Sequence, residues 1–179
     1  NAIDHITKYV LAHLFVARRT KNACIDFLQQ IKTMCYTQIL QRYHDEKNKP
    51  KQKRKLITFV SDKFGNYKRA FNKLFLHVAK LEFGVPIKMR KYGLKHNNNH
   101  IERYNQDIKD RIKTMRHFGS FDDAKSFLNL KTIIHNFINP HMQLKGQTPA
   151  ENADIHLPLK RNKLLNLIKF SRRNHITRT

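Results

Sequence analysis

The stretch from residue 97 to residue 116 reads NNNHIERYNQDIKDRIKTMR. Its apolar residues recur every three or four positions, at Ile101, Tyr104, Ile108, Ile112 and Met115. An α-helix turns by about 100° per residue, so this spacing puts them on one narrow stripe. We therefore predict a single helix over Asn97–Arg116 whose apolar stripe faces a core.

Charged side chains form a second stripe on the same predicted helix. They are Glu102, Lys109, Lys113 and Arg116. A carboxylate near a helix start can hold a divalent metal, while cations further along can bind a polyanion. A simpler interpretation stays open, because Asn99 and Glu102 have the spacing of a capping box and local pairs such as Asp110 with Lys113 can stabilise a solvated face.

The composition is strongly basic. Lys and Arg number 36 against 13 Asp and Glu, which gives a net charge of +23 over 179 residues, a length sufficient for one domain with a sizeable core. Such an excess repels itself, so a polyanionic partner is the simplest explanation, and nucleic acid is the commonest. A membrane is disfavoured because no segment approaches the roughly 18 apolar residues of a spanning helix and no lipidation motif is present.

The cysteine usage favours free thiols in a reducing compartment. Cys24 and Cys35 fall within one predicted helix, about 16 Å apart along its axis, which is too far for a disulfide. They also lack the spacing of a zinc site. The chain does not begin with methionine, and we expect further sequence upstream of Asn1.

Periodicity and turn residues predict the order of elements. The first half contains a hairpin with its turn over 3–8 and its second strand over 9–17, a helix over 20–41, a strand over 56–60, a helix over 66–76 and an edge strand over 77–81. The second half contains a loop over 82–96, the helix described above, a helix over 121–139 ended by Pro140, a short helix near 148–151 and a basic tail from Leu157 that can form an amphipathic helix. This order predicts a mixed α/β fold.

The apolar run LITFV, 56–60, is typical of a strand buried on both faces in the middle of a sheet. Asp62 follows it, where open α/β sheets place their ligand sites, although Asp62 could equally be a turn residue before Gly65. His135 lies beside an apolar helix face and is more typical of a core or surface histidine than of a metal ligand.

The segment KNKPKQKRK, 47–55, has no apolar residue and is predicted to be a solvated loop. It could contact DNA, act as a nuclear localisation signal or be a plain charged connector. The sequence assigns it no special role.

Three stretches in this order resemble insertion-sequence transposases of the DDE superfamily. They are VSD at 60–62, NNNHIER at 97–103 and NPHMQLKGQTPAE at 139–151, with 39 residues between Asp62 and Glu102. The resemblance covers nearly the whole chain. It implies the ribonuclease H-like fold of retroviral integrases, a mixed sheet flanked by helices, here with its first strand apparently missing.

The resemblance also implies a chemistry. Asp62 and Glu102 would be the second and third members of an acidic triad that holds two divalent metals, Mg²⁺ or Mn²⁺, for cleavage and strand transfer of DNA. Arg103, Lys109, Lys113 and Arg116 would bind DNA, both transposon ends and target. Self-association into a homo-oligomer, and a place on DNA in the cytoplasm of a prokaryotic-type cell, follow from the same resemblance.

The chain departs from the family pattern at its amino end. The first catalytic aspartate is expected on a strand before the hairpin, and Asp4, in the hairpin turn, matches a position outside the triad. We therefore expect a truncated core over 1–153, inactive as a fragment, followed by a basic tail over 154–179. The alternatives are a non-catalytic DNA-binding remnant and a basic RNA-binding or ribosomal protein, which would explain the charge but not the placement of Asp62 and Glu102.

Overall fold

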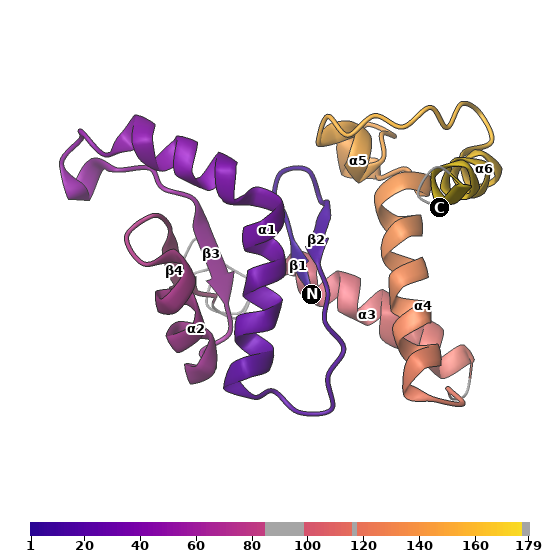
Figure 1. The fold of residues 1–179 in the computed structure, drawn as a ribbon, viewed down its shortest axis with the longest axis horizontal. Helices are drawn as coiled ribbons and strands as arrows, with labels where there is room; N and C mark the ends of the chain where they lie inside the picture. Colours follow the sequence, from indigo (N-terminus) through magenta and orange to yellow (C-terminus); the bar gives the residue numbers. More distant parts are fainter. Residues whose placement is uncertain (85–98, 116–117, 177–179) are drawn as a thin grey trace. The chain divides into compact units, whose positions relative to one another are not determined.

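The computed structural model describes residues 1–84, 99–115 and 118–176 (Figure 1). Arg116 and most of the loop expected over 82–96 lie outside these residues, as do the side chains of Asn99 and of residues 173–176. The chain divides into two compact units, which we describe separately. Unit 1 comprises residues 1–2 and 11–107, and unit 2 comprises residues 3–10 and 108–179.

A short hairpin of β1 (Ala2–Ile3) and β2 (Val10–Ala12) opens the chain. In its turn, Asp4 Oδ2 accepts hydrogen bonds from the backbone N–H groups of Ile6 and Thr7, at 3.1 and 2.6 Å, and from the Thr7 hydroxyl at 2.7 Å. The hairpin is as predicted, but its second strand ends at Ala12 rather than at residue 17. The strand that pairs with it has only two residues, so the ladder of hydrogen bonds runs out.

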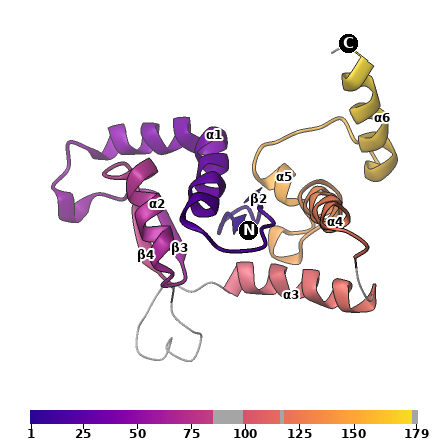
Figure 2. The same cartoon turned by 60° about the horizontal axis from the view of Figure 1, so that its bottom comes forward.

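In unit 1, α1 (Lys21–Glu46) packs along α2 (Gly65–Phe75). Figure 2 shows α2 beside the strands β3 (Thr58–Ser61) and β4 (Lys80–Phe83), and the ring of Phe59 lies 5.3 and 4.9 Å from the rings of Phe71 and Phe75. α1 begins directly after Thr20, where the predicted helix starts and where Thr20 Oγ1 accepts from the Ala23 N–H at 3.1 Å, but it continues five residues beyond the predicted end at 41. Cys24 and Cys35 both lie on α1 and both are free.

The strands β3 and β4 are parallel, with Thr58 opposite Lys80 and Ser61 opposite Phe83. Among the described residues they form a two-stranded sheet. Phe59 packs onto α2, whereas the next side chain along the strand, Val60, is 37% exposed. The expectation of a strand buried on both faces is therefore wrong for β3, because the part of the chain that is described covers only one of its faces well.

The helix α3 (Asn99–Thr114) follows the predicted stripe. Tyr104 and Ile108 are buried, and Ile101 and Ile112 are half-buried. Met115 lies just beyond the helix and is 46% exposed. The apolar periodicity thus predicted the buried face correctly, and it failed only where the helix had already ended.

In unit 2, α4 (Phe121–Ile133) starts at the Ser120 cap and runs into a π-helical turn, η3 (Ile134–Ile138). The buried Asn136 bonds both backbone groups of Val10: its Oδ1 accepts from the N–H at 2.9 Å and its Nδ2 donates to the carbonyl at 3.0 Å. His135 Nε2 lies 2.9 Å from the Lys8 carbonyl oxygen. These contacts attach residues 8–10 to η3.

The segment 139–151 folds into a compact loop. The short 3₁₀ helix η4 (Met142–Leu144) is followed by Lys145 and Gly146 at φ 53° and 83°, and then by α5 (Pro149–Asn152). Thr148 and Glu151 form a capping box, with the Thr148 N–H donating to Glu151 Oε2 at 2.8 Å and the Glu151 N–H to Thr148 Oγ1 at 3.3 Å. Lys163, the first residue of α6 (Lys163–Ile176), donates to Glu151 Oε1 at 2.6 Å. The short helix predicted near 148–151 and the predicted tail helix are both present.

Candidate carboxylate and DNA-binding site

Asp62 directly follows β3, which ends at Ser61, and precedes α2, which begins at Gly65. Its carboxylate is half exposed, and its Oδ2 lies 3.0 Å from Nη1 of Arg19. The Arg19 guanidinium also lies 5.8 Å from the centre of the Phe64 ring. The position at the carboxyl end of a strand is the predicted one, but the arginine partner was not predicted, because it lies 43 residues away and no local pattern links the two.

Two other titratable side chains lie near this ion pair. Burial raises the pKa of the Cys24 thiol, Arg19 opposes that rise, and the charge of Asp62 adds to it. Burial also raises the pKa of the Tyr67 hydroxyl, with smaller contributions from Cys24 and Asp62. Both groups are therefore neutral at neutral pH, so neither is an activated nucleophile.

Glu102 lies in the first turn of α3, and its side chain is exposed. The capping interpretation rests on the side chain of Asn99, which lies outside the described residues. Arg103, Lys109 and Lys113 are exposed on the same helix, and Lys113 Nζ lies 4.0 Å from Asp110 Oδ1. An exposed pair of this kind contributes little energy and does not prevent Lys113 from contacting a phosphate.

Metal binding has partial support from the donor chemistry. Carboxylate oxygens are the ligands that Mg²⁺ prefers, and Asp62 and Glu102 both belong to unit 1. Within residues 1–84, 99–115 and 118–176, no three His, Cys, Asp or Glu side chains come together in a group that could hold a metal ion. Two carboxylates are the right type of ligand for a divalent metal, but the described residues do not provide a third ligand beside them. We therefore assign no catalytic step to these residues.

The fold and site define a class. A mixed α/β domain with an acidic residue at a strand end and a large positive charge is typical of proteins that act on nucleic-acid backbones. A family model of the DDE domain of insertion-sequence transposases matches residues 1–141. Because this match covers most of the chain, the protein belongs to that family, as the sequence motifs indicated. Neither a curated protein nor a solved structure gives a significant match.

The motif at 139–151 carried much of the resemblance, and its structural role is now clear. Its residues close a tight loop and cap α5, and the buried Thr148 and Pro149 hold that loop against its unit. Burial removes the His141 imidazole from water and lowers its pKa, and repulsion from the positive charge of Lys8 lowers it further. The capping box and the buried residues therefore stabilise this loop. None of the described helices is long and apolar enough to cross a membrane.

Proposed function

We propose that this chain is the core of a DNA transposase whose reaction is metal-dependent cleavage and strand transfer of DNA. The observation that supports it is the acidic residue Asp62 at the carboxyl end of β3 in a chain of the DDE family. Asp62 and Glu102 would hold Mg²⁺ or Mn²⁺, which activates water or a 3′-hydroxyl and stabilises the leaving oxygen at a phosphodiester.

The chain's own residues would orient and retain the substrate. Arg19 pairs with Oδ2 of the Asp62 carboxylate at 3.0 Å, and this pair would orient the carboxylate. Arg103, Lys109, Lys113 and Arg116 would contact the phosphate backbone of transposon ends and target. In this proposal residues 1–153 form the core, residues 154–179 form a basic tail, and the protein self-associates on DNA in the cytoplasm of a prokaryotic-type cell.

A second candidate is a basic DNA-binding remnant without catalysis. The ion pair of Arg19 with Asp62 favours this second candidate. Such pairs are common on protein surfaces, where they compensate a carboxylate without any metal. The two candidates share the DNA partner and differ in whether the two acids bind a metal.

Mn²⁺ titration of the full chain, by calorimetry, separates the two candidates. Asp62→Asn and Glu102→Gln should each weaken Mn²⁺ binding by at least about 10-fold, while duplex DNA binding stays within about twofold. Asp110→Asn, an exposed acid on the same helix as Glu102, is the matched control and should change neither. Mn²⁺ binding that survives both replacements would exclude the catalytic assignment and leave the remnant.

A further inference from the structure

Glu46, the last residue of α1, is buried although it is charged: it is only 3% exposed. Its Oε1 accepts from Lys49 Nζ at 2.8 Å, and its Oε2 accepts from the Lys55 N–H at 3.0 Å. These hydrogen bonds, that of Lys49 first, hold the pKa of the carboxyl below its usual range. A buried charge is costly unless it is paired and hydrogen-bonded, and here it is both.

Glu46 sits under the segment 47–55, which we call the basic loop. Two arginines bond the backbone of this loop. Arg54 donates to the carbonyls of Lys47 and Lys49, at 2.6 and 2.8 Å, and Arg42 donates to the carbonyl of Lys55 at 2.9 Å. The loop therefore returns to the end of α1 through specific contacts. The loop is exposed, as its composition predicted, and these hydrogen bonds also order it.

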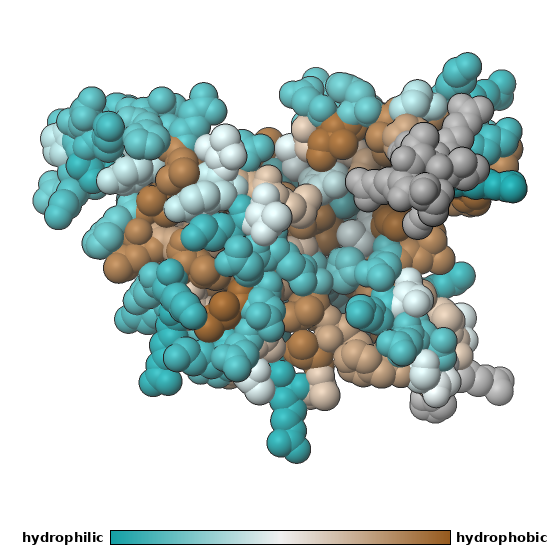
Figure 3. Space-filling model, viewed as in Figure 1, coloured by the Kyte–Doolittle hydropathy of each residue, from teal (hydrophilic) through white to brown (hydrophobic). Residues whose placement is uncertain are grey.

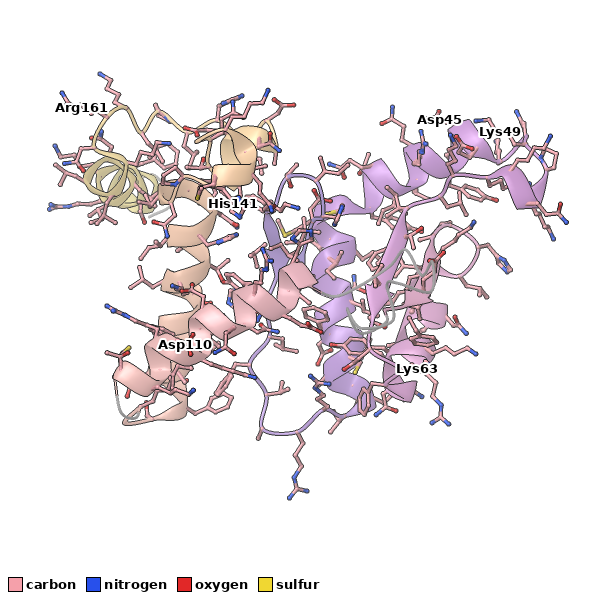
Figure 4. All side chains as sticks on the ribbon, turned by 180° about the vertical axis from the view of Figure 1, so that it is seen from behind. Asp45, Lys49, Lys63, Asp110, His141 and Arg161 are labelled. Carbon is pink, nitrogen blue, oxygen red and sulfur yellow. The ribbon has the colours of Figure 1, made fainter. Side chains whose placement is uncertain are left out.

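The side chains of most lysines in the basic loop take no part in the hydrogen bonds just described. The loop contains five lysines and one arginine in nine residues and no acid. Lys51 and Lys53 lie on the short 3₁₀ helix η1 (Lys51–Lys53), and both are exposed. Figure 3 shows hydrophilic residues over this end of unit 1, and Figure 4 places Asp45 and Lys49 at the tip of α1.

Holding six cations together costs energy, because they repel one another. A connector would avoid that cost by remaining extended and mobile. An ordered loop has already lost the conformational freedom that a binding loop must lose, so it binds a polyanion more tightly for the same charge. The hydrogen bonds of Glu46, Arg42 and Arg54 therefore favour binding to a regular array of phosphates, because they fix the loop before the partner binds.

We infer that the basic loop is a second contact surface for the backbone of duplex DNA, separate from the cations of α3. The choice of DNA rests on the proposed function. Within unit 1 the loop lies at one end of α1, while Arg19, the partner of Asp62, lies just before the other end. α1 has 26 residues and bends along its course (Figure 1), so the helix between the two places is about 39 Å long when measured along its axis, roughly 11 base pairs of duplex.

The first test uses the salt dependence of duplex binding by the full chain, measured by fluorescence anisotropy. The double variant Lys51→Gln, Lys53→Gln should lower the slope of log K against log salt by about 1.8, because two phosphate contacts are lost. The matched control is Lys68→Gln, Lys73→Gln, which removes the same charge from exposed positions of α2 and should leave the slope unchanged. An unchanged slope in the loop variant, or an equal fall in the control, overturns the inference.

The second test separates order from charge. Glu46→Gln keeps every loop cation and raises the net charge by one, so a purely electrostatic surface would bind DNA equally or more tightly. An ordered contact surface predicts the opposite, a loss of roughly 2- to 10-fold. If Glu46→Gln binds DNA more tightly, the order of the loop does not contribute to binding. Whether the loop contacts DNA at all is tested by the lysine variants. Failure of the wild-type chain to bind duplex DNA would instead overturn the proposed function.

Discussion

Single polar side chains bond backbone groups in the loops and at a strand end of this protein. Asp4 closes the hairpin turn, Asn136 bonds both backbone groups of Val10, and Glu46 accepts from the backbone of Lys55. Each partner lies in a loop or at a strand end, where a backbone N–H would otherwise need water. The shape of the loops in both units therefore depends on a few side chains that can be replaced one at a time.

Replacing Asn136 by Ala should destabilise the protein by about 2–4 kcal/mol, because two buried backbone groups of Val10 lose their partner. Urea unfolding followed by circular dichroism measures the free energy of unfolding. Asn139→Ala removes the same amide from an exposed position nearby and should cost under about 0.5 kcal/mol. Equal losses in the two variants would contradict the assigned role of Asn136.

Glu151 should make stability depend on pH. The hydrogen bond from Lys163 and then that from the Thr148 N–H lower the pKa of its carboxyl in the folded state. Its contribution is therefore fully present above the unfolded pKa of about 4.3 and is lost as the pH falls through the folded pKa. Glu151→Gln keeps an amide oxygen that can accept from the Thr148 N–H but loses the charge that strengthens the bond from Lys163, so it should cost about 1 kcal/mol at pH 7, and this difference from wild type should shrink below about pH 4.

Asp154→Asn is the control for this pH experiment, because the Asp154 side chain is 99% exposed. It should follow the wild-type curve of unfolding free energy against pH. If the difference between wild type and Glu151→Gln stays constant down to pH 2, the lowered pKa of Glu151 does not contribute to stability.

At the scale of the element, α3 separates a buried stripe from a charged one. Tyr104 and Ile108 are buried, whereas Glu102, Lys109 and Lys113 are exposed. This division is what a helix needs if it is to pack through one face and bind a polyanion through another. It also makes the charged face open to substitution without a change in the packing.

Replacing Lys109 or Lys113 by Gln should lower the salt slope of duplex binding by about 0.9 each, because each would release one phosphate contact. Helical circular dichroism should be unchanged, since both side chains are exposed. Arg111→Gln is the matched control, because about 200° of helix rotation separates it from each lysine and places it on another face. An unaltered slope for both lysines would leave them as a solvated surface.

At the scale of the whole molecule, the net charge of +23 acts on folding and on binding in opposite directions. Repulsion among the cations disfavours the compact state, and salt screens that repulsion. The same salt weakens the attraction to a polyanion. The two effects give a test of whether repulsion or local ion pairing dominates this surface.

The midpoint of thermal unfolding should therefore rise between 50 mM and 500 mM sodium chloride, while duplex affinity falls. The variant with Gln at positions 51, 53, 68 and 73 has four fewer positive charges and should show a smaller rise. A midpoint that falls with salt would mean that attractive pairs, such as Lys163 with Glu151, outweigh the repulsion.

The helices and the motif positions were predictable because they depend on nearby residues. The stripe of α3, the Thr20 cap and the capping box at Thr148 each depend on residues three or four positions apart. The place of Asp62 followed from the short apolar run before it. The Arg19 partner of Asp62 and the bracing of the basic loop were not predictable, because charge alone does not say which cations meet which anions.

From the sequence by itself came the mixed α/β class, the order of elements, the basic character, the DDE family and the two candidate acids. The tertiary structure alone decided that β3 has one exposed side, that Arg19 neutralises Asp62, that Asn136 binds Val10 and that Glu46 orders the basic loop. The physical reason is range. Periodicity and capping act within a few residues of chain, whereas burial and ion pairing depend on which distant segments the fold brings together.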